Sequence, residues 1–268
     1  MRRTRLDAEL VRRGLARSRG QAAELVEAGR VLIGGQPATK VATAVGPDVP
    51  LVVAAANAGT PDFVSRGGHK LAGALAAFTP FGLEVSGRRC LDAGASTGGF
   101  TDVLLRAGAA EVVAVDVGYG QLAWSLRTDE RVVVLDRTNV RDLTLELVGG
   151  PVDLIVGDLS FISLTVVLPA LVGVAAAGAD VVVMVKPQFE VGRERVGAGG
   201  VVRDPRLRAA AVRSVAAAAA EHGLGVLGVV ASPLPGPAGN VEYFLWLRAG
   251  AHLLDESELS KALAEGPS

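Results

Sequence analysis

The first part of the chain combines two helix-like patterns of apolar and polar positions with several short strand-like stretches. Residues 5–14 and 18–29 each carry apolar side chains at helical spacing and end near a glycine, and Ser18 can cap the second helix. The strand-like stretches follow at 31–38 (a hairpin with a Gly-Gly turn), 43–45 and 51–54. The pattern predicts a small α+β domain over residues 1–55, with a helix pair backed by a small sheet.

After this domain the pattern changes to apolar strand-like runs that alternate with helical stretches. A linker rich in small, turn-forming residues is expected over 56–66. The predicted strands are 90–91, 111–116, 131–135, 152–156, 180–185, 225–231 and 241–247, and the clearest predicted helices are 68–78 and 205–222. Such alternation predicts an α/β domain over 67–252, with a mostly parallel sheet covered on both faces. Residues 253–268 are polar and are expected to form a fraying tail.

The turn between the first predicted strand and the next helix is rich in glycine: Asp92-Ala-Gly-Ala-Ser-Thr-Gly-Gly-Phe100. A strand, a glycine-rich turn and a helix N-terminus together present backbone N–H groups to a nucleotide-like ligand. Ser96 stands where the dinucleotide fingerprint has its second glycine. The carboxylate of Asp92 disfavours a pyrophosphate but suits a cationic amino group, so the loop favours S-adenosylmethionine over NAD.

Asp116 ends the second strand, 22 residues after Gly94. An acidic residue at this position binds ribose hydroxyls in doubly wound folds. At the end of a strand, an Asp also commonly caps a turn. The combination with the glycine-rich loop favours the ribose interpretation.

Charge is unevenly distributed along the chain. Residues 1–40 carry nine Lys or Arg and four acidic residues, a local charge of +5, whereas the whole chain has a net charge of −1. A small basic domain attached to a mildly acidic one is typical of a module that docks on a polyanion.

The content and spacing of particular residue types argue against several other kinds of protein. The single cysteine, Cys90, excludes an internal disulfide, and His69, His222 and His252 lie too far apart for zinc-ligand spacing, so no metal is expected. The N-terminus lacks the apolar segment of a signal peptide, and a cytoplasmic location is expected. The 21 residues of 159–179 carry no charge, but their Ser, Thr, Pro and Gly content favours a buried helix and strand over a membrane span.

Four charged residues lie where this architecture places functional groups: Lys70, Asp158, Lys186 and Glu242. Lys70 belongs to the helix before the first strand, and Glu242 is expected inside the last strand. Asp158 and Lys186 follow the fourth and fifth strands, at the edge where ligands of open α/β sheets bind. Each charge alone is typical of a solvated or paired surface group, but the four together indicate a site.

These four residues and the glycine-rich loop resemble the K-D-K-E tetrad and cofactor loop of FtsJ-type ribose 2′-O-methyltransferases, and residues 5–248 resemble the TlyA family, also labelled haemolysin-like. Further matching stretches begin at Val117, Asp158, Lys186 and Ser232. The segment Leu6–Arg19 resembles the RNA-binding domain of small-subunit ribosomal protein S4. The resemblance implies a Rossmann-like class I methyltransferase with a seven-stranded sheet, and 2′-O-methylation of cytidine in ribosomal RNA of the small subunit and often of the large.

The resemblance also implies roles for residues. Lys186 would be the base or oxyanion stabiliser, Lys70 and Asp158 its partners, and Glu242 an orienting group. A free lysine, with a pKa of about 10.4, is a poor base, so desolvation or a nearby cation such as Lys70 would have to act on it. Candidate contacts of S-adenosylmethionine are Asp92, Gly94, Ala95, Ser96, Gly98, Gly99, Phe100, Asp116, Val117, Asn139, Asp158 and Phe161. Candidate RNA contacts are Arg3, Arg5, Arg17, Arg19, Lys40 and Arg66, with ribosomal RNA or ribosomal subunits as partners.

Four other functions fit parts of the sequence. A membrane-active haemolysin would need the 159–179 window to insert into a bilayer. A non-catalytic ribosome-binding factor would have no reason to keep two lysines beside a cofactor pocket. A nicotinamide-dependent oxidoreductase is disfavoured by the loop, and a base methyltransferase by the absence of an N-P-P-Y-like or catalytic cysteine motif.

Overall fold

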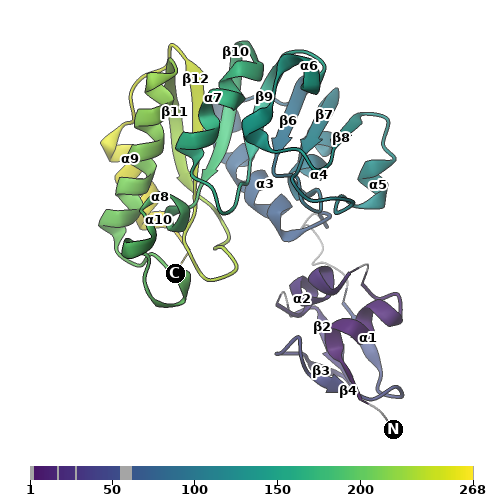
Figure 1. Ribbon diagram of the computed structural model, residues 1–268. Coiled ribbons are helices and arrows are strands. Elements are labelled where there is room, and N and C mark those ends of the chain that lie inside the picture. Colours follow the sequence, from purple (N-terminus) through teal and green to yellow (C-terminus); the bar gives the residue numbers. More distant parts are fainter. Residues whose placement is uncertain (1–2, 17, 28, 55–61, 268) are drawn as a thin grey trace. The chain divides into compact units, whose positions relative to one another are not determined.

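The computed structural model describes the chain apart from residues 1–2, 17, 28, 55–61 and 268. It divides into two compact units, Met1–Arg66 and Gly67–Ser268 (Figure 1). The candidate RNA contact Arg17 and much of the expected linker lie outside the described residues.

The N-terminal unit contains two helices and short antiparallel strands around a small apolar core. Its elements are β1 (Thr4–Arg5), α1 (Leu6–Arg12), α2 (Arg19–Glu27), β2 (Val31–Ile33), β3 (Gln36–Pro37), β4 (Ala44–Val45) and β5 (Leu51–Val53). Strand β2 pairs with β3 and β5, and β1 pairs with β4. Leu6 and Leu10 of α1 pack with Ala22 and Val26 of α2 and with Val31. The predicted helix pair and small sheet are thus confirmed.

The C-terminal unit is built on a seven-stranded sheet with the order β11-β12-β10-β9-β6-β7-β8. Its strands are β6 (Arg89–Ala93), β7 (Glu111–Val115), β8 (Val132–Leu135), β9 (Val152–Gly157), β10 (Ala175–Val185), β11 (Leu224–Ala231) and β12 (Tyr243–Ala249). Neighbouring strands from β8 to β10 are parallel, and β12 is antiparallel to both β10 and β11. The predicted mostly parallel α/β sheet is confirmed.

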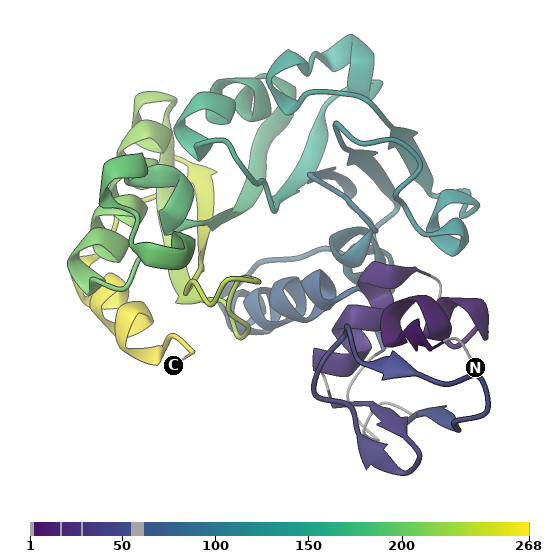
Figure 2. The ribbon, with the colours of Figure 1, turned by 60° about the horizontal axis from the view of Figure 1, so that its bottom comes forward.

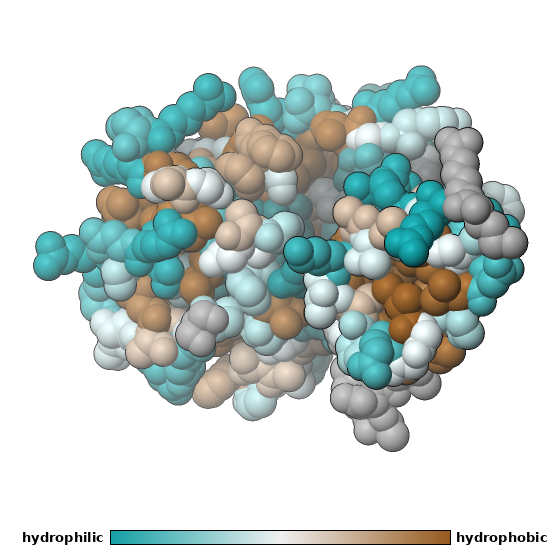
Figure 3. All heavy atoms as spheres, turned by 90° about the horizontal axis from the view of Figure 1, so that it is seen from below, coloured by the Kyte–Doolittle hydropathy of each residue, from teal (hydrophilic) through white to brown (hydrophobic). Residues whose placement is uncertain are grey.

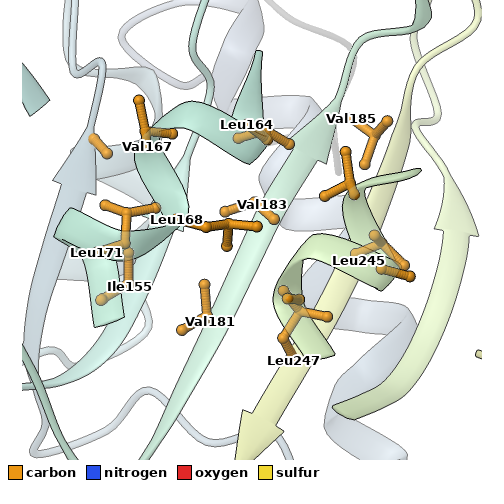
Figure 4. Packing of buried hydrophobic residues seen from close by; sticks show 14 of the residues in the cluster. Ile155, Leu164, Val167, Leu168, Leu171, Val181, Val183, Val185, Leu245 and Leu247 are labelled. Atoms are coloured by element: carbon orange, nitrogen blue, oxygen red, sulfur yellow. The ribbon is translucent and has the colours of Figure 1, made fainter. Parts of the chain in front are cut away.

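Helices cover both faces of this sheet (Figure 2). The α-helices are α3 (Arg66–Phe78), α4 (Gly99–Arg106), α5 (Trp124–Arg127), α6 (Leu145–Val148), α7 (Leu164–Val174), α8 (Pro187–Glu190), α9 (Pro205–Glu221) and α10 (Glu256–Glu265). Short 3-10 helices lie at η1 (Thr79–Phe81), η2 (Val140–Asp142), η3 (Arg193–Arg195) and η4 (Ala198–Gly200). On one face, strand side chains such as Ile155, Val183 and Leu245 pack with α7 and α9 (Figure 4). On the other, Phe244 and Trp246 contact Phe100 of α4 and Phe78 of α3.

Two expectations about the C-terminal region are wrong. The polar tail forms α10, because Asp255 caps its first turn and the buried Leu259 and Ala262 give it an apolar side that packs with the sheet core. Glu242 lies one residue before β12, not inside the strand. The antiparallel direction of β12 still brings Glu242 to the edge where the parallel strands end.

The uncharged 159–179 window forms α7 and the start of β10. Within the described ranges, no helix has the length and apolar character needed to cross a membrane. On the surface seen in Figure 3, hydrophobic residues lie between hydrophilic ones that project around them.

Candidate functional site

The candidate site lies at the carboxyl ends of β6 and β9, where the order of strands along the sheet reverses direction. Ala93 pairs with Gly157 at the ends of these strands, and the Asp158 N–H donates to the Ala93 carbonyl (3.1 Å). Ligands of open α/β sheets bind at such a switch point.

The glycine-rich loop approaches neighbouring backbone at this point. Gly94 has a φ of +88°, and a Cβ there would lie 2.8 Å from the carbonyl oxygen of Asp158. Gly98, with a φ of +98°, precedes α4 and leaves no room for a Cβ beside Leu126. Only glycine fits both constraints, so these two glycines allow the loop to pack closely against the end of β9 and against Leu126.

Asp116 ties the second strand to this loop. Its carboxylate accepts hydrogen bonds from the N–H groups of Ser96 (2.8 Å) and Gly118 (2.7 Å). The segment after β8 joins the same arrangement, since Thr138 N–H donates to the Asp116 carbonyl and Asn139 caps η2. The structure therefore places Ser96, Asp116 and the segment that contains Asn139 next to one another, and their contact with a cofactor remains a prediction.

Asp92 lies fully buried beneath the loop. Thr101 Oγ1 donates to its Oδ2 (2.7 Å), while Oδ1 is buried without a hydrogen-bond partner among the described residues. Burial raises the pKa of Asp92 to about 7, and the hydrogen bond from Thr101 only partly opposes this. An unpaired carboxylate oxygen in this position suits a cationic group of a ligand.

Replacing Asp92 by Asn tests this burial through stability. Because the folded-state pKa is raised, the ionised carboxylate destabilises the native state, and wild-type stability should fall as the pH rises from about 4 to 7. We expect D92N to lack this component, so that its stability relative to wild type increases by about 3 kcal/mol between pH 5 and 8. Urea denaturation at both pH values measures the difference. A difference that does not change with pH would contradict the assignment.

Two buried lysines each form an ion pair beside the loop. Lys70 Nζ of α3 lies 2.5 Å from Glu242 Oε2, and Lys186 Nζ lies 2.6 Å from Asp158 Oδ1. Val185 and Tyr243 are paired across β10 and β12, so Lys186 and Glu242 follow and precede that pair at the same edge. The structure thus brings the four predicted residues together as two ion pairs, with Glu242 and not Lys186 as the direct partner of Lys70.

A close backbone approach sets the position of Glu242. A Cβ on Gly236 would lie 2.6 Å from Glu242 Oε1, and a Cβ on Gly73 of α3 would lie 2.7 Å from Pro233. The Ser-Pro-Leu-Pro-Gly segment therefore packs directly on α3 and on the carboxylate that holds Lys70. The close contacts involve the first proline, Pro233, and the glycine, Gly236, where a side chain would collide with Glu242.

Sequence reasoning missed two residues that organise the site. Ser160 Oγ accepts a hydrogen bond from Lys186 Nζ (2.8 Å). Glu190, after Lys186 in the same stretch, accepts from the Leu164 N–H (2.8 Å) and from the Ser163 hydroxyl at the start of α7. Burial raises the pKa of Glu190. Both residues belong to segments that the sequence singled out, but only the fold shows which side chains meet.

Two predicted cofactor residues lie in unexpected surroundings. Phe100 is buried in the core, with its ring centroid 6.0 Å from that of Phe244, so its side chain is not part of an open pocket. Phe161 is 91% exposed, has a φ of +65° and contacts Phe189, with 5.3 Å between ring centroids. Its ring therefore faces solvent next to Phe189, whose own ring centroid lies 5.9 Å from Lys186 Nζ.

The described candidate RNA contacts are accessible to differing degrees. Arg3 and Lys40 are exposed, and Arg66 is half-buried at the start of α3. Arg5 and Arg19 both form ion pairs with Asp7. In the part of the chain that the structure describes, no group of His, Cys, Asp or Glu could hold a metal ion.

Comparison with protein families agrees with this geometry. The model of the FtsJ-like methyltransferases matches residues 63–249, which span the sheet, the glycine-rich loop and both ion pairs. The chain belongs to the FtsJ-like methyltransferase family. The S4 domain model matches residues 4–49 of the N-terminal unit.

Relatives of this FtsJ-like methyltransferase cover nearly the whole chain. The 16S/23S rRNA (cytidine-2′-O)-methyltransferase TlyA of Mycobacterium tuberculosis is 63% identical over 272 residues, 99% of each chain. Hemolysin A of Brachyspira hyodysenteriae is 37% identical over 89% of this chain and 97% of its own. A Streptococcus thermophilus structure described as that of a candidate hemolysin has a TM-score of 0.78 and 37% identity, covering 99% of this chain and 96% of its own.

Membership of this family makes the chain a methyltransferase and implies S-adenosylmethionine as the methyl donor. The residues fit that cofactor. The unpaired Oδ1 of Asp92 suits an amino group, Gly94 carries no side chain at the end of β6, and Asp116 suits a ribose.

Proposed function

We propose that this FtsJ-like methyltransferase transfers a methyl group from S-adenosylmethionine to the ribose 2′-oxygen of cytidine in ribosomal RNA, of the small subunit and also of the large. The observation that carries the proposal is the ion pair between Lys186 and Asp158 beside the glycine-rich loop. The relative from Mycobacterium tuberculosis, named for this reaction on 16S and 23S rRNA, supports the choice of nucleotide. Such a substrate implies action in the cytoplasm.

Methyl transfer to a ribose hydroxyl requires the loss of its proton. The cofactor supplies a methyl group on a positively charged sulfur. Lys186, held by Asp158 and Ser160, is placed to stabilise negative charge on the 2′-oxygen. Lys186 can accept the ribose proton once its ammonium group has given up a proton, for which Asp158, its ion-pair partner 2.6 Å away, is the nearest acceptor, and the pair then returns this one extra proton to solvent.

The second ion pair supports this arrangement without a direct proton step. Lys70 and Glu242 are both more than 90% buried and neutralise each other. Their ion pair therefore joins α3 to the residue directly before β12. We propose that Lys70 provides a second positive charge near the reacting oxygen and that Glu242 holds Lys70 in position. Both assignments depend on pairing, since either charge alone would be buried without compensation.

For the cofactor, we assign the amino end to Asp92 and the backbone around Gly94, Ala95 and Ser96, and the ribose to Asp116. The remaining assigned contacts are Gly98, Gly99, Val117, Asn139 and Asp158. We assign Phe161 to the RNA and not to the cofactor, because an exposed ring that contacts Phe189, itself next to Lys186, suits stacking on a nucleobase.

For RNA docking, we assign phosphate contacts to the exposed basic residues of the N-terminal unit, Arg3, Arg5, Arg19 and Lys40, and also to Arg17 and Arg66. Phosphate contacts position an RNA and make binding salt-dependent, but discriminate little between sequences. The choice of cytidine therefore depends on RNA shape and on how the base reaches the site.

The direct test is transfer of a labelled methyl group from S-adenosylmethionine to purified unmodified ribosomal subunits and to free ribosomal RNA, followed by digestion to nucleosides. Label on the 2′-oxygen of cytidine is the expected result. Label on a base would overturn the mechanism. Absence of label from both subunits and RNA, with cofactor still bound, would favour a non-catalytic binding factor.

Ser160 gives a separate prediction about positioning. Without its hydroxyl, Lys186 loses one of its two polar partners in the site, and we expect S160A to lower kcat roughly tenfold while leaving the KM for RNA unchanged. Steady-state methylation assays measure both constants, and S160T, which retains a hydroxyl, should recover most of the rate. An unchanged kcat in S160A would show that Asp158 alone positions Lys186.

A further inference from the structure

Asp7 forms the centre of a hydrogen-bonded cluster on the S4 domain. Its side chain is 5% exposed and accepts from Arg5 Nε and Nη2 (both 3.1 Å) and from Arg19 Nε (3.1 Å) and Nη2 (2.8 Å). It also accepts from the Ala8 N–H (2.8 Å). Two arginines from different elements, β1 and α2, therefore converge on one carboxylate of α1.

The geometry of these contacts leaves part of each guanidinium group available to another hydrogen-bond acceptor. Asp7 accepts hydrogen bonds from Nε and Nη2 of both guanidinium groups. The Nη1 atom of each arginine therefore lies on the side that faces away from Asp7. The side chains of Arg5 and Arg19 are 53% and 61% exposed, so an acceptor from solution can reach them. A planar guanidinium held at one edge presents its other donors in a fixed orientation.

The Asp7 carboxylate stays ionised near neutral pH, so the cluster of Asp7, Arg5 and Arg19 keeps all its charges. The hydrogen bond from Arg5 lowers the pKa of Asp7 far below its usual value, although burial opposes this, and Arg19 adds to the lowering.

We propose that Asp7 is a positioning residue for RNA docking, which holds the guanidinium groups of Arg5 and Arg19 together as one clamp for a phosphate of the RNA backbone. The ligand rests on the proposed function of this protein. The arrangement removes rotamer freedom from two long side chains before RNA arrives, so less conformational entropy is lost on binding.

The proposal predicts that replacing Asp7 changes RNA affinity in the direction opposite to the one expected from net charge alone. Removing an acidic residue from a basic RNA-binding surface should strengthen the attraction of a polyanion. If Asp7 positions the arginines, its neutralisation should instead weaken binding. Asp48, an exposed acidic residue of the same unit, provides the control for charge alone.

The fold offers a matched control for a buried carboxylate. Glu9, also in α1, is 2% exposed and pairs with Arg12 and Arg13. Arg13 additionally donates to the carbonyls of Gly46, Pro47 and Val49, so this second cluster braces the domain. Thermal unfolding of D7N beside E9Q shows how much of any effect comes from the fold.

The experiment measures the affinity of the full-length protein for unmodified 16S and 23S rRNA transcripts over a range of KCl concentrations. D7N should bind about tenfold more weakly than wild type, whereas D48N should bind equally or up to about twofold more tightly. In an Arg5→Ala/Arg19→Ala background, D7N should cause no further loss, because its effect passes through those two side chains.

Three results would overturn the proposal. The first is D7N affinity equal to or greater than wild type. The second is the same loss from D7N with and without the two arginines, which would assign Asp7 to the fold alone. The third is wild-type protein that binds neither transcript, which would refute RNA docking itself and is distinct from the other two.

Discussion

Replacement of Lys186 by Ala is expected to lower the rate of methyl transfer to ribosomal RNA by at least about a hundredfold. The variant removes the group that meets Asp158 at 2.6 Å and Ser160 at 2.8 Å, and with it both charge stabilisation and the proton path. The measurement is the single-turnover rate constant with labelled S-adenosylmethionine at saturating RNA. The site of the label should be read in digested nucleosides.

Two controls separate chemistry from folding. Lys261 is an exposed lysine of α10, and K261A removes the same charge away from the site, so its rate should match wild type. Cofactor affinity of K186A, measured by calorimetry, should remain close to wild type. A K186A rate within threefold of wild type would refute the assigned role of Lys186.

Replacement of Asp180 by Ala is expected to destabilise the C-terminal unit by about 3 kcal/mol. This fully buried carboxylate, near the start of the β10–β12 pairing, accepts hydrogen bonds from Trp246 Nε1 (2.6 Å), Arg248 Nε (2.8 Å) and Arg88 Nη1 (2.5 Å). Its loss leaves these donors without their shared acceptor. For a unit of this size, the Tm should fall by about 6–12 °C, measured by calorimetry.

The pH dependence of this effect has a defined sign. Burial alone would raise the pKa of Asp180, but hydrogen bonds from two arginines and a tryptophan outweigh it and lower the pKa. The stabilisation is therefore present above about pH 4 and is lost as the pH falls below that value. As a control, E256A breaks an exposed pair with Arg213 and should leave the Tm unchanged. Equal Tm values for D180A and E256A would contradict the prediction.

The sequence predicted the sheet and the loop because both depend on local patterns. Apolar runs such as 152–156 can be stable only when buried, and the glycine-rich turn between Asp92 and Phe100 requires backbone conformations that other residues avoid. The positions of Asp158 and Lys186 followed from the rule that functional groups gather at the carboxyl ends of parallel strands.

Pairing and burial could not be predicted in the same way. Glu242 lies 172 residues from Lys70, and only the strand order shows that these two residues are direct partners. The contact of Ser160 with Lys186 depends on the conformation of one loop, in which the following residue, Phe161, has a positive φ. The helix α10 was missed because its apolar side consists of few residues among many polar ones.

The reversed direction of β12 has a consequence for synthesis of the protein. Lys70 is synthesised early, whereas its partner Glu242 follows 172 residues later, directly before β12. Until that strand inserts between β10 and β11, Lys70 has no Glu242 to neutralise it, and β11 has no neighbour that joins it to the rest of the sheet. The Lys70–Glu242 pair can therefore form only after the segment before β12 has been made, whereas the Asp158–Lys186 pair needs no residue beyond the one that directly follows β10.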